Sequence, residues 1–474
     1  MKILYVTSEA APFAASGGLG DVMGALPKSV ASEEGVTAEV ILPFYEKAMK
    51  DEYKSHLEKV IDISFRLSWR NTGATVYKIN KDGINYYFVE NHYYFDRPNL
   101  YGEYDDGERF AFFSLAVLEF IKQTGNVPDI IHANDWQTAL TVVYLKTVYA
   151  KDPILSAVKT VYTIHNIEYQ GKYDKYILTD VFGLDSKDMD TVEYDGCINL
   201  MKGGIVATDI LTTVSPNYAN ELKYDYYAFG LAEIIKESEG KMHGVINGID
   251  YSYFSPENGG DIYKKYTKRS LCTGKSSNKL ALQRELGLAE DPDIPLIVMI
   301  TRLTAGKGID LVVHVANELF DEKLQFVILG TGEESFENIF TEYERYYSNV
   351  RALIKFDRIT SKRMYAAADM FLMPSKSEPC GLAQMISCSY GTVPIVHAVG
   401  GLYDSIKSYP REDSNGFTFE NYNAHELLFT VKSALDLYHN DKDEWQKLRQ
   451  RAKSSDFSWD NSAIEYIKLY RNLL

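Results

Sequence analysis

The chain has 474 residues and a formal net charge of −16 at pH 7. This length exceeds what one hydrophobic core usually supports, so we expect at least two domains. Nucleic acids and anionic membranes are bound through an excess of Lys and Arg, and the acidic charge therefore disfavours both as partners. The four cysteines form no CxxC pair, and no apolar run approaches the length of a membrane span. A reduced, cytoplasmic setting is the expectation.

The first half of the chain alternates apolar runs with polar turns. A strand is predicted at residues 3–6, followed by a glycine-rich turn with Gly17, Gly18 and Asp21 and by a helix from 22 to about 30. A strand, a glycine-rich turn and a helix together form a phosphate cradle, because free backbone N–H groups gather at the helix start. The alternative is a tight turn without a ligand.

Further strands are predicted at 40–43, at 129–132, at 160–163 and, as a hairpin around Asp82-Gly83, at 77–80 and 86–89. Residues 45–75 are mixed in character and are expected to form loops and small strands. Residues 93–108 are polar and aromatic, as in a substrate-facing loop. The strands at 129–132 and 160–163 run into Asp135 and His165, which makes both side chains site candidates. A helix cap and a hydrogen-bonded structural histidine are the alternatives.

The second half again alternates predicted strands and helices, after a polar stretch, 250–277, that is expected to be a linker. A helix is predicted at 278–286 and a strand at 296–300. The glycine-containing turn after this strand carries Arg302 and Lys307, and two cations there suit a diphosphate. Phe356 is placed at another strand end.

The stretch 374–401 is the strongest candidate for a ligand site. An apolar run, 366–373, is expected to be a buried strand, with Glu378 following its end and Gly381 allowing close approach of a ligand. Gly400 and Gly401 are expected to free N–H groups at the next helix start. A carboxylate can bind sugar hydroxyls, and free backbone N–H groups can bind phosphate. The two side by side indicate a nucleotide-sugar site. The alternative is that the glycines only form turns. The predicted fold is therefore α/β, with two doubly wound Rossmann-like domains facing a deep cleft lined by strand ends.

Ten motifs in this order resemble one family: SGGLGDV (16–22), HANDWQTA (132–139), TIHNIEYQG (163–171), TTVSPNYA (212–219), GVINGID (244–250), RLTAGKGIDL (302–311), SEPCGLAQ (377–384), YGTVPIV (390–396), GGLYDS (400–405) and DFSW (456–459). The chain resembles the bacterial glycogen synthases and plant starch synthases, which are retaining glucosyltransferases of the GT-B architecture. The resemblance implies an N-terminal acceptor-side domain at 1–250, a nucleotide-sugar domain at 251–455, and a C-terminal helix at 456–474 that packs back on the first domain.

The resemblance also implies a reaction and its participants. Glucose would pass from ADP-glucose to the non-reducing end of an α-1,4-glucan, with retention of configuration and with no cofactor or metal. Arg302 and Lys307 would hold the donor diphosphate, Glu378 the donor-sugar hydroxyls, and His165 the glucose 6-hydroxyl. Phe356 stands where the family places a Tyr that stacks on adenine. The remaining implied site residues are Gly17, Gly18, Asp21, Asp135, Asn247, Cys380, Gly381, Leu382, Gly400 and Gly401.

The chain departs from the family pattern at the expected site. Ala15 stands where the family has a lysine that binds the donor phosphate, and Asn134 replaces the second histidine of the family's H-A-H-D-W motif. These changes leave a second interpretation open: a divergent paralog with a changed nucleotide-sugar donor, or with reduced activity and a role as a glucan-binding regulatory protein.

Overall fold

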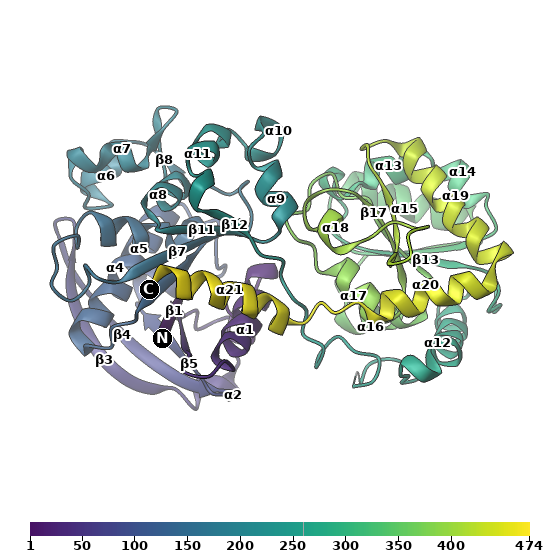
Figure 1. Cartoon of the computed structure of the whole chain (residues 1–474), viewed down its shortest axis with the longest axis horizontal. Coiled ribbons are helices and arrows are strands. Elements are labelled where there is room, and N and C mark those ends of the chain that lie inside the picture. The colour runs from purple at the N-terminus through teal and green to yellow at the C-terminus, as the bar shows by residue number, and fades with distance from the viewer. Residues whose placement is uncertain (259) are drawn as a thin grey trace. The chain divides into compact units, whose positions relative to one another are not determined.

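The computed structural model describes residues 1–258 and 260–474 (Figure 1). The chain forms two compact units. Unit 1 comprises Met1–Gly248 together with Trp459–Leu474, and unit 2 comprises Ile249–Ser458. Within the described residues, no helix combines the length and apolar character needed to cross a membrane.

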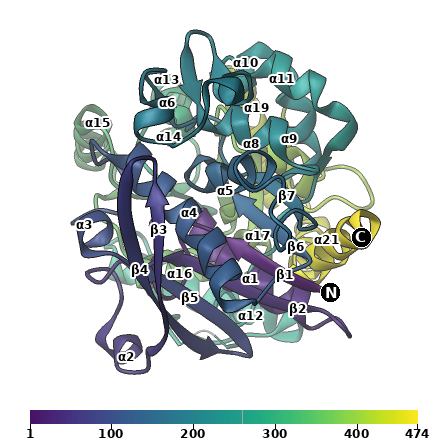
Figure 2. The same cartoon turned by 90° about the vertical axis from the view of Figure 1, so that its left-hand side faces the viewer.

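Unit 1 is built on a nine-stranded sheet with the order β12-β11-β7-β6-β1-β2-β5-β4-β3. The strands from β12 to β5 run parallel. Strands β4 and β3 form an antiparallel edge (Figure 2). The strand bounds are β1 Lys2–Val6, β2 Thr37–Pro43, β3 Glu58–Leu67, β4 Arg70–Lys81, β5 Ile84–Glu90, β6 Ile130–Asn134, β7 Lys159–Ile164, β11 Ile210–Thr213 and β12 Met242–Gly244. A small three-stranded sheet adds β8 Lys172–Tyr173, β9 Glu193–Tyr194 and β10 Cys197–Asn199.

The helices of unit 1 cover this sheet, and the C-terminal helix belongs to the same core. Trp459, Tyr466 and Tyr470 of α21 are buried in one hydrophobic cluster with residues of β1 and α1. The helix bounds are α1 Gly18–Ala31, α2 Asp51–Lys54, α3 His92–Phe95, α4 Asp106–Thr124, α5 Trp136–Lys146, α6 Ile177–Asp180, α7 Met189–Val192, α8 Leu200–Ala207, α9 Pro216–Glu221, α10 Asp225–Ala228, α11 Ala232–Glu237 and α21 Trp459–Leu473.

Unit 2 is built on a six-stranded parallel sheet with the order β15-β14-β13-β16-β17-β18. The chain first adds strands on one side of β13 and then on the other, so the strand order reverses between β13 and β16. Ligands of open α/β sheets bind at such a reversal, beyond the carboxyl ends of the strands. The bounds are β13 Leu296–Ile300, β14 Gln325–Leu329, β15 Val350–Leu353, β16 Met370–Met373, β17 Val393–His397 and β18 Phe417–Phe419.

The helices of unit 2 lie between and after these strands. Their bounds are α12 Leu271–Glu285, α13 Ile309–His314, α14 Ala316–Phe320, α15 Glu334–Tyr346, α16 Arg358–Ala367, α17 Ala383–Ser389, α18 Gly400–Ser405, α19 Ala424–Asn440 and α20 Lys442–Ser454. Two parallel Rossmann-like sheets in two units confirm the predicted α/β fold class.

Three local predictions were wrong. Residues 58–75, expected to form loops and small strands, belong to the long β3–β4 hairpin, because much of β3 is exposed and its side chains are accordingly polar. Helix α12 begins at Leu271, inside the expected linker. Its polar side chains are buried and bonded: the Nζ of Lys275 donates to the Thr392 hydroxyl at 2.6 Å and to the Tyr365 carbonyl at 3.0 Å. The run at 366–373 is divided, since Ala366 and Ala367 end α16 before β16 begins.

Candidate functional site

The reversal point of unit 2 brings Lys307 and Glu378 together. Lys307 follows β13, Glu378 follows β16, and these strands are neighbours in the sheet. The Nζ of Lys307 lies 2.6 Å from Oε2 of Glu378, and the two side chains are 21% and 11% exposed. A cation and a carboxylate are thus placed at the position where this fold holds ligands.

Close backbone packing fixes the two loops that carry this ion pair. Gly308 has a φ of +75°, and a Cβ there would lie 2.1 Å from the Pro374 carbonyl oxygen. The N–H of Lys376 donates to the carbonyl of Gly306 at 3.0 Å. Only glycine fits at position 308, so the sequence sets the approach of the two loops.

Arg302 and Phe356 lie at the same carboxyl edge of the sheet. Arg302 is exposed, and its guanidinium makes no hydrogen bond or ion pair with the rest of the described chain. Phe356 follows β15, which stands two strands from β13, and the side chain is 82% exposed. A free cation and a bare aromatic ring are therefore both open to a ligand.

The two glycines at the start of α18 have a role other than the predicted one. The N–H of Gly401 is not free, because it donates to the carbonyls of Glu378 and Pro379, both at 3.1 Å. A Cβ at Gly400 would lie 2.0 Å from the Glu378 carbonyl, and one at Gly401 would lie 2.2 Å from that of Cys380. These glycines admit the backbone of the Glu378 loop and hold it in place.

The rest of this loop is fixed by one amide side chain. Gln384 donates from Nε2 to the carbonyls of Cys380 and Gly381, each at 3.0 Å. Gly381 has a φ of +71°, a value that favours glycine. Cys380 is buried and Leu382 precedes the first residue of α17. The backbone from 380 to 382 is therefore rigid where it follows Glu378.

In unit 1, Asp135 and His165 meet at neighbouring strand ends. They follow β6 and β7, and Oδ1 of Asp135 accepts a hydrogen bond from the His165 N–H at 2.7 Å. Desolvation raises the pKa of Asp135 to about 7, although backbone N–H groups of His165 and Asn166 oppose this rise. Asp135 thus orders the His165 turn through its backbone.

Asn134 sets the tautomer of His165, a role that residue type alone did not indicate. Its Nδ2 donates to the carbonyls of Val6 at 3.1 Å and His132 at 3.2 Å, so its Oδ1 faces the His165 Nε2 as an acceptor at 2.9 Å. Nε2 of His165 must therefore donate, which leaves Nδ1 as an acceptor. Burial lowers the pKa of His165 to about 3, so the ring is neutral near pH 7.

The glycine-rich turn is part of a helix start. Helix α1 begins at Gly18, four residues before the predicted start, with Gly17 as its N-cap residue. Ala15 and Asp21 are exposed beside it. The N–H groups of Ser16 and Gly17 donate to the carboxylate of Glu9. A cradle that was expected to hold phosphate therefore already holds a carboxylate of its own chain.

Asn247 follows β12 at the far end of the same sheet. It is 6% exposed, and its Oδ1 has no hydrogen-bond partner among the residues the structure describes. A buried amide oxygen without a partner is costly unless a ligand or water satisfies it. Asn247 thus carries an unused acceptor, whereas Asp135 and His165 are joined to each other.

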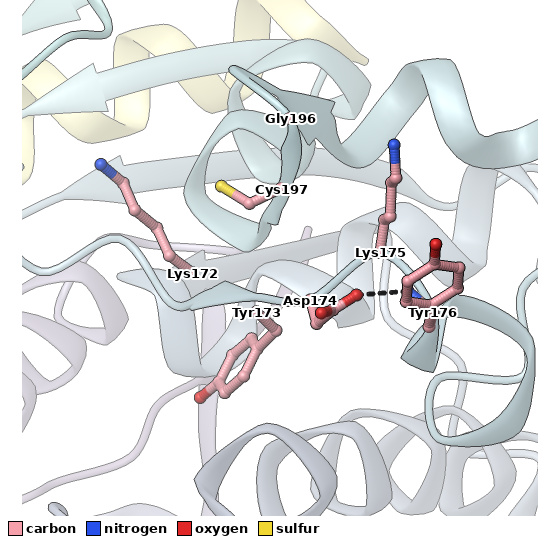
Figure 3. A pocket seen from close by; sticks show the side chains of 7 residues that line it. All are labelled: Lys172, Tyr173, Asp174, Lys175, Tyr176, Gly196 and Cys197. Atoms are coloured by element: carbon pink, nitrogen blue, oxygen red, sulfur yellow. Dashed lines mark hydrogen bonds between the residues drawn. The ribbon is translucent and has the colours of Figure 1, made fainter.

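Two cavities of about 400 Å³ lie elsewhere in unit 1. One lies over β8 and β10 and is lined by Lys172, Tyr176 and Cys197 among others (Figure 3). The other is lined by residues of α9, β12 and α21. No predicted site residue lines either cavity. Metal ligands are also not grouped: in residues 1–258 and 260–474, no three His, Cys, Asp or Glu side chains could hold a metal ion.

Comparison with known proteins accounts for both units. Residues 2–237 match the starch synthase catalytic domain, and residues 283–455 match the glycosyl transferases group 1 family. Over the whole of both chains, the sequence is 43% identical to the glycogen synthase of Ligilactobacillus salivarius and 44% identical to that of Bacillus cereus. The chain belongs to the glycogen and starch synthase family. The family resemblance noted in the sequence is thereby confirmed.

Solved structures agree with this family and its fold. The catalytic domain of starch synthase IV from Arabidopsis thaliana, bound to ADP and acarbose, matches with a TM-score of 0.90 and 32% identity over 99% of this chain and 98% of that one. A sucrose-phosphate synthase from Thermosynechococcus elongatus matches with a TM-score of 0.61 and 15% identity, over 100% of this chain and 98% of that chain. That second likeness supports the fold alone. The GT-B fold class is confirmed.

Proposed function

We propose that the protein is a glycogen synthase, which transfers glucose from ADP-glucose to the non-reducing end of an α-1,4-glucan with retention of configuration. The observation that carries the proposal is the Lys307–Glu378 pair, 2.6 Å apart at the reversal point of the unit 2 sheet. Full-length identity of 43–44% to glycogen synthases supports the same activity. The proposed location is the cytoplasm, where four free cysteines stay reduced.

Unit 2 is the proposed donor-binding unit. Arg302 and Lys307 would bind the diphosphate through charge-assisted hydrogen bonds. Glu378 would bind hydroxyls of the donor glucose, helped by the rigid backbone from Cys380 to Leu382, and Phe356 would stack on the adenine. Because Lys307 is paired with Glu378, the arriving diphosphate and sugar must replace that ion pair with their own contacts.

Unit 1 is the proposed acceptor-side unit. The Nδ1 acceptor of neutral His165 suits a hydroxyl donor, which fits the glucose 6-hydroxyl. Asp135 would hold the His165 turn, and Asn247 would satisfy its buried Oδ1 through a ligand hydroxyl or amide. Gly17, Gly18 and Asp21 complete the set of proposed binding residues.

The chemistry requires charge stabilisation more than proton transfer by the protein. As the glycosidic bond breaks, negative charge develops on the departing diphosphate, and Arg302 and Lys307 are fixed cations for that charge. We propose that the acceptor 4-hydroxyl attacks the anomeric carbon of the donor glucose on the same face that the diphosphate leaves. The leaving phosphate oxygen takes the proton of that hydroxyl. No carboxylate is assigned as a covalent nucleophile. Exclusion of water would prevent hydrolysis of the donor.

The test is a donor assay with a matched pair of variants. Purified protein is incubated with ADP-glucose or UDP-glucose and a glucan primer, and nucleotide release and chain growth are followed. We expect ADP-glucose to be used without added metal and in the presence of EDTA. Glu378→Gln should abolish most transfer, whereas Glu318→Gln, an exposed carboxylate on α14, should leave the rate unchanged.

A second function is favoured by one observation, the uncharged and exposed Ala15 in the glycine loop. A paralog with a changed donor would release nucleotide from UDP-glucose in preference to ADP-glucose. A regulatory paralog would bind glucan measurably and release no nucleotide from either donor. Either result would replace the first proposal.

A further inference from the structure

A buried carboxylate lies beneath the glycine loop of unit 1. Glu9 follows β1, is 3% exposed, and forms no ion pair with any described residue. Its Oε2 accepts hydrogen bonds from the Ser16 N–H and, at 3.2 Å, from the Gly17 N–H. Its Oε1 accepts from the Ser16 hydroxyl at 2.8 Å and from the Tyr101 hydroxyl at 2.5 Å. Hydrogen bonds and the positive end of the α1 dipole therefore satisfy this buried carboxylate without an ion pair.

The same carboxylate connects the glycine loop to a second loop. Tyr101 lies in the polar, aromatic stretch 93–108, and its single hydroxyl proton goes to Glu9, so the Ser8 hydroxyl donates to Tyr101 at 2.8 Å. Arg109 holds this stretch from within the core. It is fully buried, and it donates to the carbonyls of Tyr94 at 2.7 Å and Leu100 at 3.3 Å.

Small residues keep the glycine loop close to the carboxylate. A Cβ at Gly20 would lie 2.4 Å from the Cβ of Ala15 and 3.3 Å from Oε2 of Glu9. The N–H of Ala11 donates to the Gly20 carbonyl at 2.9 Å. Close packing thus restricts the conformation of the loop, and the loop folds around the Glu9 carboxylate. The N–H groups of Gly18 and Leu19, at the start of α1, donate to no other residue that the structure describes.

We propose that Glu9 is a positioning residue for the transferase reaction. Its carboxylate clamps the glycine loop and the 93–108 loop into one geometry and leaves the first N–H groups of α1 available to a ligand. This inference rests on the proposed function and adds a residue that residue type and motif did not single out. A glutamine at position 9 could not replace it, because an amide has one acceptor oxygen and would turn its NH₂ group toward donors.

The experiment compares Glu9→Gln with Glu39→Gln. Glu39 is a matched control: it is a little-exposed carboxylate of the same unit that also accepts from a tyrosine, Tyr87, at 3.1 Å, but it lies on β2 away from both loops. Backbone hydrogen exchange of the full-length protein is measured first. In Glu9→Gln, the peptides that contain Ser16–Gly17 and Tyr101 should both exchange faster, while the rest of the sheet keeps its protection. In Glu39→Gln, neither peptide should change.

Steady-state kinetics with ADP-glucose and a glucan primer then tests positioning. Glu9→Gln should lower kcat/KM by about 10- to 100-fold, the scale of a roughly 1 Å misplacement. Its effect should not add to that of Tyr101→Phe, because both break one network. Glu39→Gln should keep the wild-type rate even if its melting temperature falls as much as that of Glu9→Gln.

Each result decides between separate ideas. Unchanged exchange in both loops overturns the clamp, whatever the activity. Faster exchange with wild-type kcat/KM, or an additive double variant, overturns the positioning role. If the wild-type protein uses no donor, the proposed function fails on its own, and hydrogen exchange still decides whether Glu9 is the clamp.

Discussion

Positive charge at the proposed binding residues comes from unit 2 and not from the glycine loop. Arg302 is exposed and makes no ion pair with any residue that the structure describes, and Lys307 is held by Glu378. In unit 1, Ala15 offers only a methyl group, and Glu9 adds a negative charge beneath the loop. The nucleotide is therefore expected to depend on the two cations of unit 2.

Ala15→Lys should tighten the binding of ADP. The new ammonium would stand beside the start of α1, and one charge-assisted hydrogen bond is worth about 1.5–3 kcal/mol. This corresponds to a Kd that is about 10- to 100-fold lower, measured by isothermal titration calorimetry. Ala15→Met, which has a similar length and no charge, should leave the Kd unchanged. Unchanged or weaker binding in Ala15→Lys would show that the loop does not reach the phosphates.

The buried histidines predict a pH dependence of stability. Desolvation lowers the pKa of His132 from 6.5 to about 3, and the ring is fully buried between Tyr470 and Thr163. Because the folded pKa lies below the unfolded one, its contribution is present above pH 6.5 and is lost as the pH falls toward 3. The effect of Asp135 on stability has the opposite pH dependence. Because its folded pKa is raised, the free energy of unfolding falls as the pH rises from 3.8 toward 7.

The measurement is therefore a difference between variants. The free energy of unfolding of the wild type should fall relative to His132→Gln below pH 6.5, with a limiting slope of about 1.4 kcal/mol per pH unit for one proton. Urea denaturation at several pH values between about 7 and 5 gives the difference. Parallel pH profiles for the two proteins would mean that His132 is not a neutral buried group.

At the scale of single residues, the sequence predicted positions better than partners. Strand-end placement identified Lys307, Glu378, Asp135 and His165, and the sheet order places each pair side by side. It did not identify Glu9 or Asn134, because their importance lies in hydrogen bonds to residues that are distant along the chain or that belong to another strand. An acidic residue between a first strand and a glycine-rich turn was the one available signal for Glu9.

At the scale of elements, the loops of unit 2 are shaped by close contacts that only glycine allows. A Cβ added at Gly308, Gly400 or Gly401 would lie within 2.2 Å of a carbonyl oxygen of the 374–380 segment. The three glycines come from two different loops and converge on the backbone that carries Glu378. The position of Glu378 is thus set by backbone packing around it as well as by its ion pair.

Gly308→Ala should damage both folding and activity. The added methyl group would meet the Pro374 carbonyl, and the φ of +75° is strained for alanine. We expect a loss of about 1–3 kcal/mol in the free energy of unfolding and a large fall in kcat/KM. Gly306→Ala is the control, because no described residue other than its two chain neighbours lies within 4 Å of its Cβ position. Equal behaviour of the two variants would contradict the packing argument.

The spacing of apolar residues along the sequence predicted the buried elements. It failed where a strand is exposed or where polar side chains are buried. The strand at 296–300 has the predicted bounds, since a parallel strand covered on both faces is apolar throughout. Strand β3 was missed because its exposed face is polar. The first half of α12, before the predicted helix at 278–286, was missed because the polar side chain of Lys275 is buried with partners. Pairing across the fold cannot be read from local composition.

At the scale of the whole molecule, the two units differ in how the chain builds them. Unit 2 is one continuous segment, and its ends are joined by the hydrogen bond from the Ile249 N–H to the Phe457 carbonyl at 2.8 Å. Unit 1 needs both ends of the chain. The Tyr470 hydroxyl of α21 lies 3.0 Å from that of Tyr5 and 2.7 Å from Nδ1 of His132, all within the core.

Residues 249–458 should therefore fold alone, whereas residues 1–248 should not. The first segment keeps its own hydrophobic core and the Lys307–Glu378 pair, so we expect a single cooperative unfolding transition and ADP binding with a Kd close to that of the full chain. The second segment loses Trp459, Tyr466 and Tyr470 from its core, and truncating several large buried side chains costs more than a domain's usual margin of about 5–15 kcal/mol. Joining residues 459–474 to the end of 1–248 through a flexible linker should restore its folding. If 249–458 folds but binds ADP much more weakly than the full chain, the cations of unit 2 are not sufficient, and unit 1 takes part in holding the nucleotide.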